Sequence, residues 1–500
     1  MALVVDFLDR IGCRGRPANL TRSIATAAGA AVSIYFVVVA FCIYWLAYLP
    51  AAALTFVLPR RLIERIALPL LIVSSIGVAA LTQTIDTFFP DYANPREIML
   101  ELALWCGVGI FARSYLIYTA QPGTFEAIKA SIATRWPDRW FAANLHNPLD
   151  AAFTRIWIGN AIAMIPITVL VILPSTLNYF VIAAWSAALL LVLFPQDLIE
   201  HTHMHNRLFT PRIGSSERVK RILSALQWFF EYPVTLLTIR IPEFYRIQHV
   251  YVHHVEGNGP DDTQSTMAYD RTSFLDFARH AFVQGLDLLT GCLLIPYLRR
   301  KGKSRQLREL FHGMAVFYAI VLAITLLNPL AAALILFSRL VGGQVLSLFA
   351  FFQHGLIDPS DVDDVHGNTV NYHGHEHGHL GADYHVEHHL KPARHWSAYH
   401  AEAAKETATH EQGHRAMVVE KGFYSPLGMM RALWTQDYAG VAARSEMRGM
   451  DGDAARLAAL IRDRTRPIGT PERGGTMALL DRWLGQIMGH ALPTDLRVSP

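Results

Sequence analysis

Long apolar stretches separated by shorter polar segments dominate the pattern of this 500-residue chain. A helix that crosses a bilayer needs ~20 largely apolar residues. Four of the stretches form two pairs, joined by the short turns Pro174-Ser175-Thr176 and Asn328-Pro329. Such pairs predict transmembrane helical hairpins. The candidate spans, in chain order, are 27–58, 66–85, 102–118, 156–173, 178–199, 311–327 and 330–352.

Some apolar segments leave alternatives open. The stretch 27–58 contains Pro50 and is either one long span or a tight helical hairpin. The stretch 102–118 is a weaker candidate because an arginine lies inside it. Segments 229–241 and 281–298 are short or interrupted, so we expect interfacial helices or partial insertions there.

Composition supports a chain that faces lipid. Hydrophobic residues make up 52% and charged residues 17%, whereas soluble chains average ~25% charged residues. The net charge of +3 gives no indication of a nucleic-acid partner. The four cysteines are scattered without paired spacing, which argues against a disulfide framework or a cysteine-based metal site.

Positive charge fixes the expected orientation. Arginines and lysines cluster in the polar loops, above all at 299–308. Because positively charged loops stay in the cytoplasm, we expect residues 200–310 and everything after His354 on that side. The same rule favours the hairpin interpretation of 27–58. An alanine- and arginine-rich composition points to a bacterial inner membrane. The positive loops place the site on its cytoplasmic face.

Histidine is the unusual residue, with 23 in the chain. The first cluster follows directly on a span, and its His201 and His205 share one helical face because they lie four residues apart. Two imidazoles at this spacing can bind one metal. His203 lies two residues from each and points elsewhere, although a shifted set that includes it remains the alternative.

Two later clusters repeat a common arrangement, in which a histidine precedes a pair of adjacent histidines by about one helical turn. In the second cluster, His249 and His253 are expected to share a helical face, with His254 about 100° round the helix. Adjacent histidines can therefore reach two different metals. The third cluster consists of His385, His388 and His389.

Together with His354 at the end of the last span, these clusters give nine candidate metal ligands. Imidazole suits iron, zinc, copper and nickel, but one zinc takes about four ligands. Nine fit two octahedral irons that keep open positions for oxygen. Histidine ligands usually donate their second N–H to a carboxylate or carbonyl, and the carboxylates placed for this role are Asp197, Glu200, Asp261, Asp262, Asp383 and Glu387.

These residues resemble the membrane fatty acid desaturase superfamily, whose signature is three histidine boxes on the cytoplasmic side of paired helical hairpins. The boxes are His201-x3-His205, His249-x3-His253-His254 and His385-x2-His388-His389, and His354 matches the family's extra ligand. The second box also resembles the alkane hydroxylase branch. The resemblance covers about residues 150–400. It implies an all-α polytopic membrane protein with paired transmembrane hairpins and a cytoplasmic, histidine-lined metal-binding cap.

The implied activity is O2-dependent oxidation of a long-chain fatty acyl or lipid-like substrate by two Fe ions. Desaturation is the leading expectation, and hydroxylation or alkene-forming decarboxylation at the same site are the alternatives. No haem-domain motif is present, so a separate electron donor such as a ferredoxin, a rubredoxin or a reductase is implied. A competing class is a membrane metal transporter, but transport needs ligands at membrane depth.

The predicted division of the chain has three parts. Residues 1–150 form an amino-terminal membrane region with extra spans, residues 151–400 the catalytic region, and residues 401–500 a cytoplasmic helical extension. One charge lies deep inside the last span. Arg339 is far from both ends of that span, and charges at such depth usually face protein or water.

Overall fold

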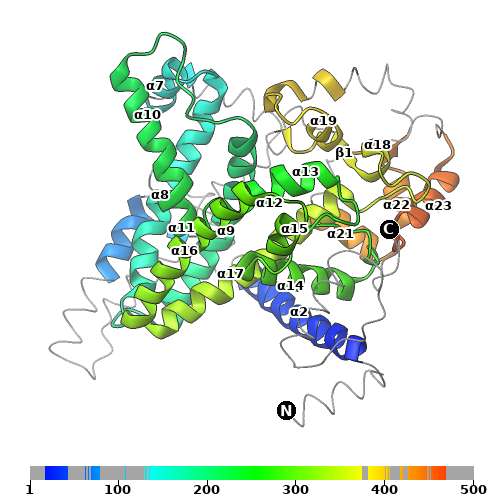
Figure 1. Cartoon of the computed structure of the whole chain (residues 1–500), viewed down its shortest axis with the longest axis horizontal. Coiled ribbons are helices and arrows are strands. Elements are labelled where there is room, and N and C mark those ends of the chain that lie inside the picture. The colour runs from blue at the N-terminus through cyan, green and yellow to red at the C-terminus, as the bar shows by residue number, and fades with distance from the viewer. Residues whose placement is uncertain are drawn as a thin grey trace.

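The computed structural model is mostly helical (Figure 1). Among the residues that it describes, five helices are long and apolar enough to cross a membrane, and a bent helix pair would make a sixth span. The described residues, apart from a few isolated ones between these segments, are 17–42, 69–78, 136–373, 381–399, 401–403, 417–420, 426–447 and 452–468.

The four spans predicted after residue 150 are long helices. They are α8 (Ala151–Ile172), α9 (Tyr179–His205), α16 (Ser304–Leu327) and α17 (Pro329–His354). α8 contacts α9, and α16 contacts α17. Their arrangement as hairpins across a bilayer stays a prediction.

Side-chain caps begin the second helix of each pair. The side chain of Asn178 accepts a hydrogen bond from the backbone N–H of Val181, at 2.9 Å. Asn328 does the same for Ala331, at 3.2 Å, and Pro329 is the first residue of α17. An asparagine cap satisfies an N–H that has no partner within the helix, and proline is tolerated at the first position. The short turns therefore specify where one helix ends and the next begins.

The spans predicted before residue 150 are described in part. Helix α2 (Pro17–Cys42) covers the first part of 27–58, and the region around Pro50 lies outside the described residues. Residues 69–78 of the predicted span 66–85 are helical. Of 102–118, two residues are described, so this predicted span remains untested.

The segment 281–298, predicted to form interfacial helices or a partial insertion, belongs to two helices. α14 (Phe274–Thr290) and α15 (Leu294–Arg300) meet at an angle of 70°. The bend follows Gly291, whose φ of +65° lies in the left-handed region that glycine adopts without strain. In Figure 1, α14 lies beside the blue α2, and it packs against both α2 and α17.

Close packing of α14 against α17 requires glycine on both helices. A Cβ added at Gly343 would lie 2.3 Å from the carbonyl oxygen of Ala281, and one at Gly285 would lie 2.3 Å from that of Leu340. The two backbones therefore approach in a way that a larger residue would prevent.

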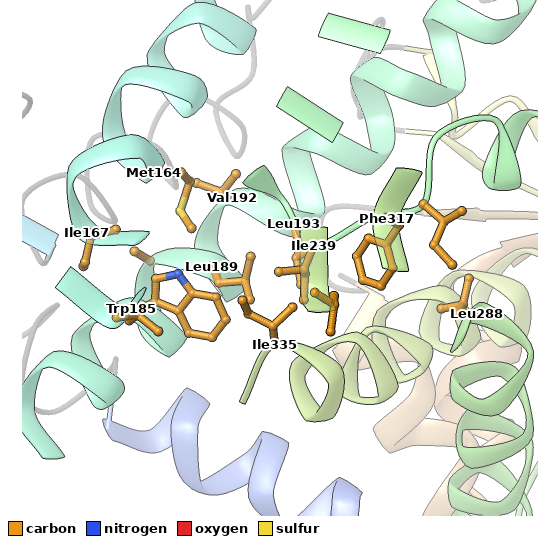
Figure 2. Packing of buried hydrophobic residues seen from close by; sticks show 14 of the residues in the cluster. Met164, Ile167, Trp185, Leu189, Val192, Leu193, Ile239, Leu288, Phe317 and Ile335 are labelled. Atoms are coloured by element: carbon orange, nitrogen blue, oxygen red, sulfur yellow. The ribbon is translucent and has the colours of Figure 1, made fainter. Parts of the chain in front are cut away.

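The main apolar core lies between α8, α9, α16 and α17 (Figure 2). Trp185 and Leu189 of α9 pack there with Ile335 of α17 and Met164 of α8. The indole N–H of Trp185 donates to the hydroxyl of Thr168 at 3.2 Å, which satisfies a polar group that lipid cannot.

The other apolar segment for which interfacial helices or a partial insertion were predicted, 229–241, is divided into short elements. After α10 (Glu217–Phe229) it forms a π-helical turn, η3 (Phe230–Val234), and then the short α11 (Thr235–Leu237). Further short elements surround the polar end of the bundle: α7 (Trp136–Asn144), η2 (Pro148–Asp150), α12 (Phe244–Gln248), η4 (His249–His253), α13 (His254–Glu256), α18 (Val365–Asn368), α19 (His385–Leu390) and η6 (Trp396–Ala398).

A small sheet, which the sequence did not predict, joins the carboxy-terminal region to the rest. β1 (Val370–His373) pairs in parallel with β2 (Met417–Glu420), in the register Val370↔Met417, and β2 pairs antiparallel with β3 (Ser445–Glu446). Helices α21 (Pro426–Trp434), α22 (Tyr438–Ala442) and α23 (Ala454–Arg464) follow. The expected helical extension thus also contributes strands; the domain boundaries at 150 and 400 stay predictions.

Candidate metal centre

Two of the long apolar helices deliver the first histidines to the same place. His201 and His205 lie in the last turns of α9, and His354 is the last residue of α17. Both helices end on the same side of the bundle, so their apolar lengths position the rings at the polar end. His203 points away, as expected: its Nε2 lies 3.1 Å from Glu231, and its Nδ1 accepts the backbone N–H of Leu208.

The second cluster corrects an expectation from α-helical spacing. His249 and His253 were predicted to share a face, but His249 groups with His254, and their Nε2 atoms are 3.0 Å apart. The reason is the local backbone, because η4 (His249–His253) is a π-helical turn. The wider π turn brings residues i and i+5 to one side. His253 is therefore free to join a different set of rings.

The third cluster keeps ordinary helical spacing. His385 and His389 of α19 are four residues apart, and their Nε2 atoms lie 3.1 Å from each other. His388 projects to the other side, where its Nε2 lies 2.9 Å from that of His201 and 2.9 Å from that of His254. The adjacent pair thus reaches two different groups of rings.

The nine histidines form two groups, within each of which the possible ligand atoms all lie within 4.8 Å of one another. The first group has five members, which come from α9, the π turn, α13 and α19. The second has four, which come from the π turn, α17 and α19. The groups are His201, His205, His249, His254 and His388, and His253, His354, His385 and His389.

The spacing of the nitrogens fits a metal with ligands at right angles. Two nitrogens that bind a metal at 2.0–2.1 Å lie about 3.0 Å apart at 90° and about 3.4 Å apart in a tetrahedron. The close Nε2 pairs here are separated by 2.9–3.1 Å. Among the residues that the structure describes, none is a hydrogen-bond partner of the buried Nε2 of His205. Five imidazoles in one group exceed a four-coordinate zinc site and suit a six-coordinate metal such as iron.

Hydrogen bonds on the far side of three rings fix their orientation. The Nδ1 of His253 lies 2.7 Å from a carboxylate oxygen of Asp262, and that of His354 lies 2.9 Å from the carbonyl oxygen of Asn368. The Nδ1 of His388 lies 3.3 Å from the hydroxyl of Tyr399. With Nδ1 engaged as a donor, Nε2 keeps its lone pair for the centre.

The other carboxylates predicted to support the rings have different contacts. Asp197 and Glu200 both form ion pairs with the buried Arg240. Asp261 pairs at the surface with Arg300 and Lys301.

Asp383 and Glu387 are buried near the third cluster. The carbonyl oxygen of Asp383 accepts from the N–H of Tyr372, and Glu387 accepts from the side-chain amide of Asn371 at 2.9 Å. Asn371 in turn accepts the N–H of Val386. Strand β1 therefore holds α19 in place.

Burial keeps the rings in the neutral form that binds metals. It is the largest cause, followed by the charge of neighbouring rings, of a pKa lowered below 6.5 for the rings of His249, His254, His385, His388 and His389. Asp262 differs: burial alone would raise its pKa, but the charge and hydrogen bond of His253 lower it below the ordinary range. A buried carboxylate thus stays ionised beside the second group.

The comparisons with known proteins agree with this geometry. The model of the family described as Fatty acid desaturase matches residues 182–420, a segment that contains all nine histidines. This part of the chain belongs to the membrane fatty acid desaturase superfamily. The comparisons with curated proteins and with solved structures gave no match. Membership in the desaturase superfamily, with five apolar helices, marks an integral membrane oxidoreductase.

A narrow cavity adjoins the histidines of this desaturase-like region. Its wall includes His201, His249, His253 and His354, and its volume is about 40 Å³. Away from the rings the wall is mostly apolar and is lined by Leu198, Leu346, Phe349 and Ala350. The cavity therefore places a mostly apolar wall next to both groups of rings.

Sequence reasoning missed several supports of the desaturase-like centre. The carbonyl of Asn368 and the hydroxyl of Tyr399 contact two of the rings, yet neither residue belongs to a histidine box. Asn368 also donates to the carbonyl of Gly257 at 2.8 Å, which ties α18 to the loop after the second box. A backbone carbonyl leaves no residue-type signal, so sequence alone could not have found this contact.

Proposed function

We propose that this chain uses O2 and two Fe ions to oxidise a long-chain fatty acyl or lipid-like substrate, with desaturation as the leading reaction. The observation that carries the proposal is the pair of adjacent histidine groups, of five and four rings, beside an apolar cavity. In desaturation, a –CH2–CH2– unit, O2, two electrons and two protons would give –CH=CH– and two waters.

The two histidine groups would each hold one iron ion. When bound, the pair supplies the reduction of O2 and the oxidising power to remove hydrogen from an unactivated C–H bond. The neutral rings supply nitrogen lone pairs, and Asp262 and the carbonyl of Asn368 hold two of these rings in orientation. The five rings of one group and the four of the other would occupy fewer than the six ligand positions of an iron ion. Both ions would therefore keep a position for oxygen.

The protein's further contribution is placement. Leu346, Phe349 and Ala350 follow one face of α17 towards His354 and form an apolar surface beside the rings. An alkyl chain in this cavity would displace water and present one part of its length to the centre. Desaturation, hydroxylation and decarboxylation would differ in how that carbon is held.

The proposed location is a bacterial inner membrane, with the histidines at the cytoplasmic face. The positive-inside rule supports this orientation, as does the position of His201, His205 and His354 at the ends of apolar helices. Electrons would come from a separate ferredoxin, rubredoxin or reductase. A transporter would need ligands along a membrane-depth path, whereas these rings gather at one end of the bundle.

Product analysis tests this function. Membranes that contain the full-length protein would be supplied with a reducing system, deuterium-labelled fatty acyl lipids and either air or argon, and the lipids analysed by mass spectrometry. We expect an oxidised product in air that is absent under argon and in the His253→Ala and His388→Ala variants. His203→Ala, on the same helix as the first box but outside both groups, is the matched control and should keep activity. Product formation under argon would contradict the proposal.

A further inference from the structure

A second cavity lies deeper along the same helices and contains a buried arginine. Its wall includes Leu193, Ile239, Leu288 and Arg339, and the first three also belong to the core drawn in Figure 2. Arg339 is 6% exposed and lies within the membrane-crossing helix α17. A guanidinium at this depth is costly unless its donors are satisfied.

Part of the guanidinium of Arg339 is engaged by the protein. Its Nε donates to the carbonyl oxygen of Leu288 at 3.0 Å, and its Cζ lies 5.7 Å from the ring centroid of Phe244. Within the described part of the chain, its two terminal nitrogens have no hydrogen bond, and no carboxylate lies within ion-pair distance of them. These Nη donors line a cavity and are available to whatever enters it.

The carboxylates near this cavity are already bound elsewhere. Asp197 and Glu200 pair with Arg240. Asp287 accepts from the backbone N–H groups of Leu293 and Leu294, and from the amide of Gln248.

The charges around the cavity leave no excess of positive charge. Glu200 and Asp287 are the carboxylates that act on Arg339 electrostatically, and Asp197 lines the wall. Two arginines thus face three acidic side chains. A further anion would compete with these acidic groups for the arginines, whereas an uncharged oxygen would accept a hydrogen bond from Arg339 without adding a charge.

The deep cavity lies next to the one beside the histidines. The two share Asp197, Tyr245 and Leu346 as wall residues. On α17 the wall follows one helical face from Arg339 to His354. These residues are fifteen apart, which at 1.5 Å per residue is about 22 Å along the helix. That length exceeds one leaflet of a ~30 Å hydrocarbon core, so the two cavities lie as far apart as the ends of a long alkyl chain.

We propose that Arg339 binds an uncharged oxygen, the hydroxyl or carbonyl of a lipid-like substrate, in the deep cavity. The alkyl chain then runs along α17, and the carbon that is oxidised lies near the histidines, far from the oxygen. This inference rests on the proposed function for its substrate channel, and it narrows the substrate class to long-chain alcohols, aldehydes, ketones or esters.

Ligand binding in the absence of oxidation tests the proposal. The full-length protein in phosphatidylcholine nanodiscs, under argon and without reductant, would be titrated with tritium-labelled 1-hexadecanol. Unlabelled hexadecane and palmitate would be used as competitors. A hydrogen bond to a charged donor is worth enough to change affinity about tenfold or more. We expect 1-hexadecanol to bind at least about tenfold more tightly than hexadecane, and more tightly than palmitate.

Variants locate the effect. Arg339→Gln should weaken the binding of 1-hexadecanol about tenfold and change the affinity for hexadecane by no more than about twofold. Arg339→Lys, which keeps the charge, should lose less affinity for 1-hexadecanol. Arg305→Gln is the control, since that side chain is exposed on α16. If neither Arg339 variant folds, the order of the wild-type affinities for the three ligands still tests whether the site prefers an uncharged oxygen.

Three outcomes would overturn the proposal. Equal affinity for alcohol and alkane would mean that water alone occupies the donors of Arg339. Tightest binding of palmitate would mean that the site selects an anion. A loss of alcohol binding in Arg305→Gln as large as in Arg339→Gln would remove the assignment to Arg339. Because no turnover is measured, each result stands apart from the test of the oxidation reaction.

Discussion

Replacing Asp262 with asparagine should weaken metal binding in one histidine group and spare the other. The carboxylate of Asp262 lies 2.7 Å from the Nδ1 of His253, and the two side chains are 0% and 5% exposed. Its oxygens also accept backbone N–H groups from Asn258 at 3.1 Å and Gln264 at 2.9 Å. Asparagine keeps the shape but loses the negative charge.

The size of the expected loss in metal affinity follows from the kind of hydrogen bond that is lost. A hydrogen bond to a charged group contributes ~1.5–3 kcal/mol and a neutral one ~0.5–1.5 kcal/mol. The difference, about 1.5 kcal/mol, is close to tenfold in an equilibrium constant. Loss of a carboxylate that orients a metal-binding histidine typically costs about 10–100-fold in metal affinity. We therefore expect Asp262→Asn to lower the metal affinity of the second group by about 10–100-fold.

The assay is chelator competition on purified protein, with the metal retained per chain measured at each chelator concentration. In Asp262→Asn, about one of two ions should leave at a lower chelator concentration than in the wild type, and the other should be unchanged. Asp261→Asn is the matched control, because that neighbouring carboxylate pairs with surface Arg300 and Lys301. Equal weakening of both ions, or the same effect in the control, would refute the reasoning.

Three further predictions concern packing, charge and the first histidine group. Gly343→Ala should lower the free energy of unfolding by ~1–3 kcal/mol or more through overpacking, as measured by thermal unfolding in detergent. Gly342→Ala, whose added Cβ would meet a leucine methyl at 3.9 Å, should be close to neutral. Asp358 forms an ion pair with Arg464 at 2.9 Å; although burial alone would raise its pKa, hydrogen bonds from a neighbouring serine and this arginine lower it below 3.8. The stabilisation that this ion pair gives to the folded state is complete above pH ~4 and is lost as the pH falls through the folded-state pKa of Asp358. Hydrogen exchange in α23 should therefore accelerate as the pH falls through that pKa. Asp358→Asn should abolish this pH dependence. Tyr399→Phe should weaken metal binding in the first group by less than Asp262→Asn weakens the second, because its contact with the ring is neutral and 3.3 Å long; an effect on the second group would contradict this.

Much of the centre was predictable because helix periodicity and membrane length restrict where the rings can lie. His201 and His205 are four residues apart on a helix that a long apolar run specifies, and His354 ends another such helix. The same periodicity misassigned the partner of His249, because a π-helical turn has no reliable sequence signal. The number of rings was thus readable, but their distribution over two groups was not.

The supporting contacts depend on long-range packing that spacing cannot encode. Asp197 and Glu200 lie beside the first box in sequence, yet Arg240, forty residues or more away, binds both. The sheet that holds α19 joins strands separated by over forty residues. Arg339 was visible in the sequence as a charge in a span, but its cavity could be identified only once α9 and α17 were placed side by side.

Metal content per chain distinguishes a dinuclear iron centre from the alternatives. Detergent-purified wild-type protein would be analysed beside His253→Ala, His388→Ala and the control His203→Ala. We expect about two iron ions in the wild type and in the control, and loss of iron in both of the other variants, since each removes a ring from one of the two groups. Zinc, or a variable metal content that neither substitution changes, would contradict the dinuclear iron centre and favour a non-oxidative or transport function.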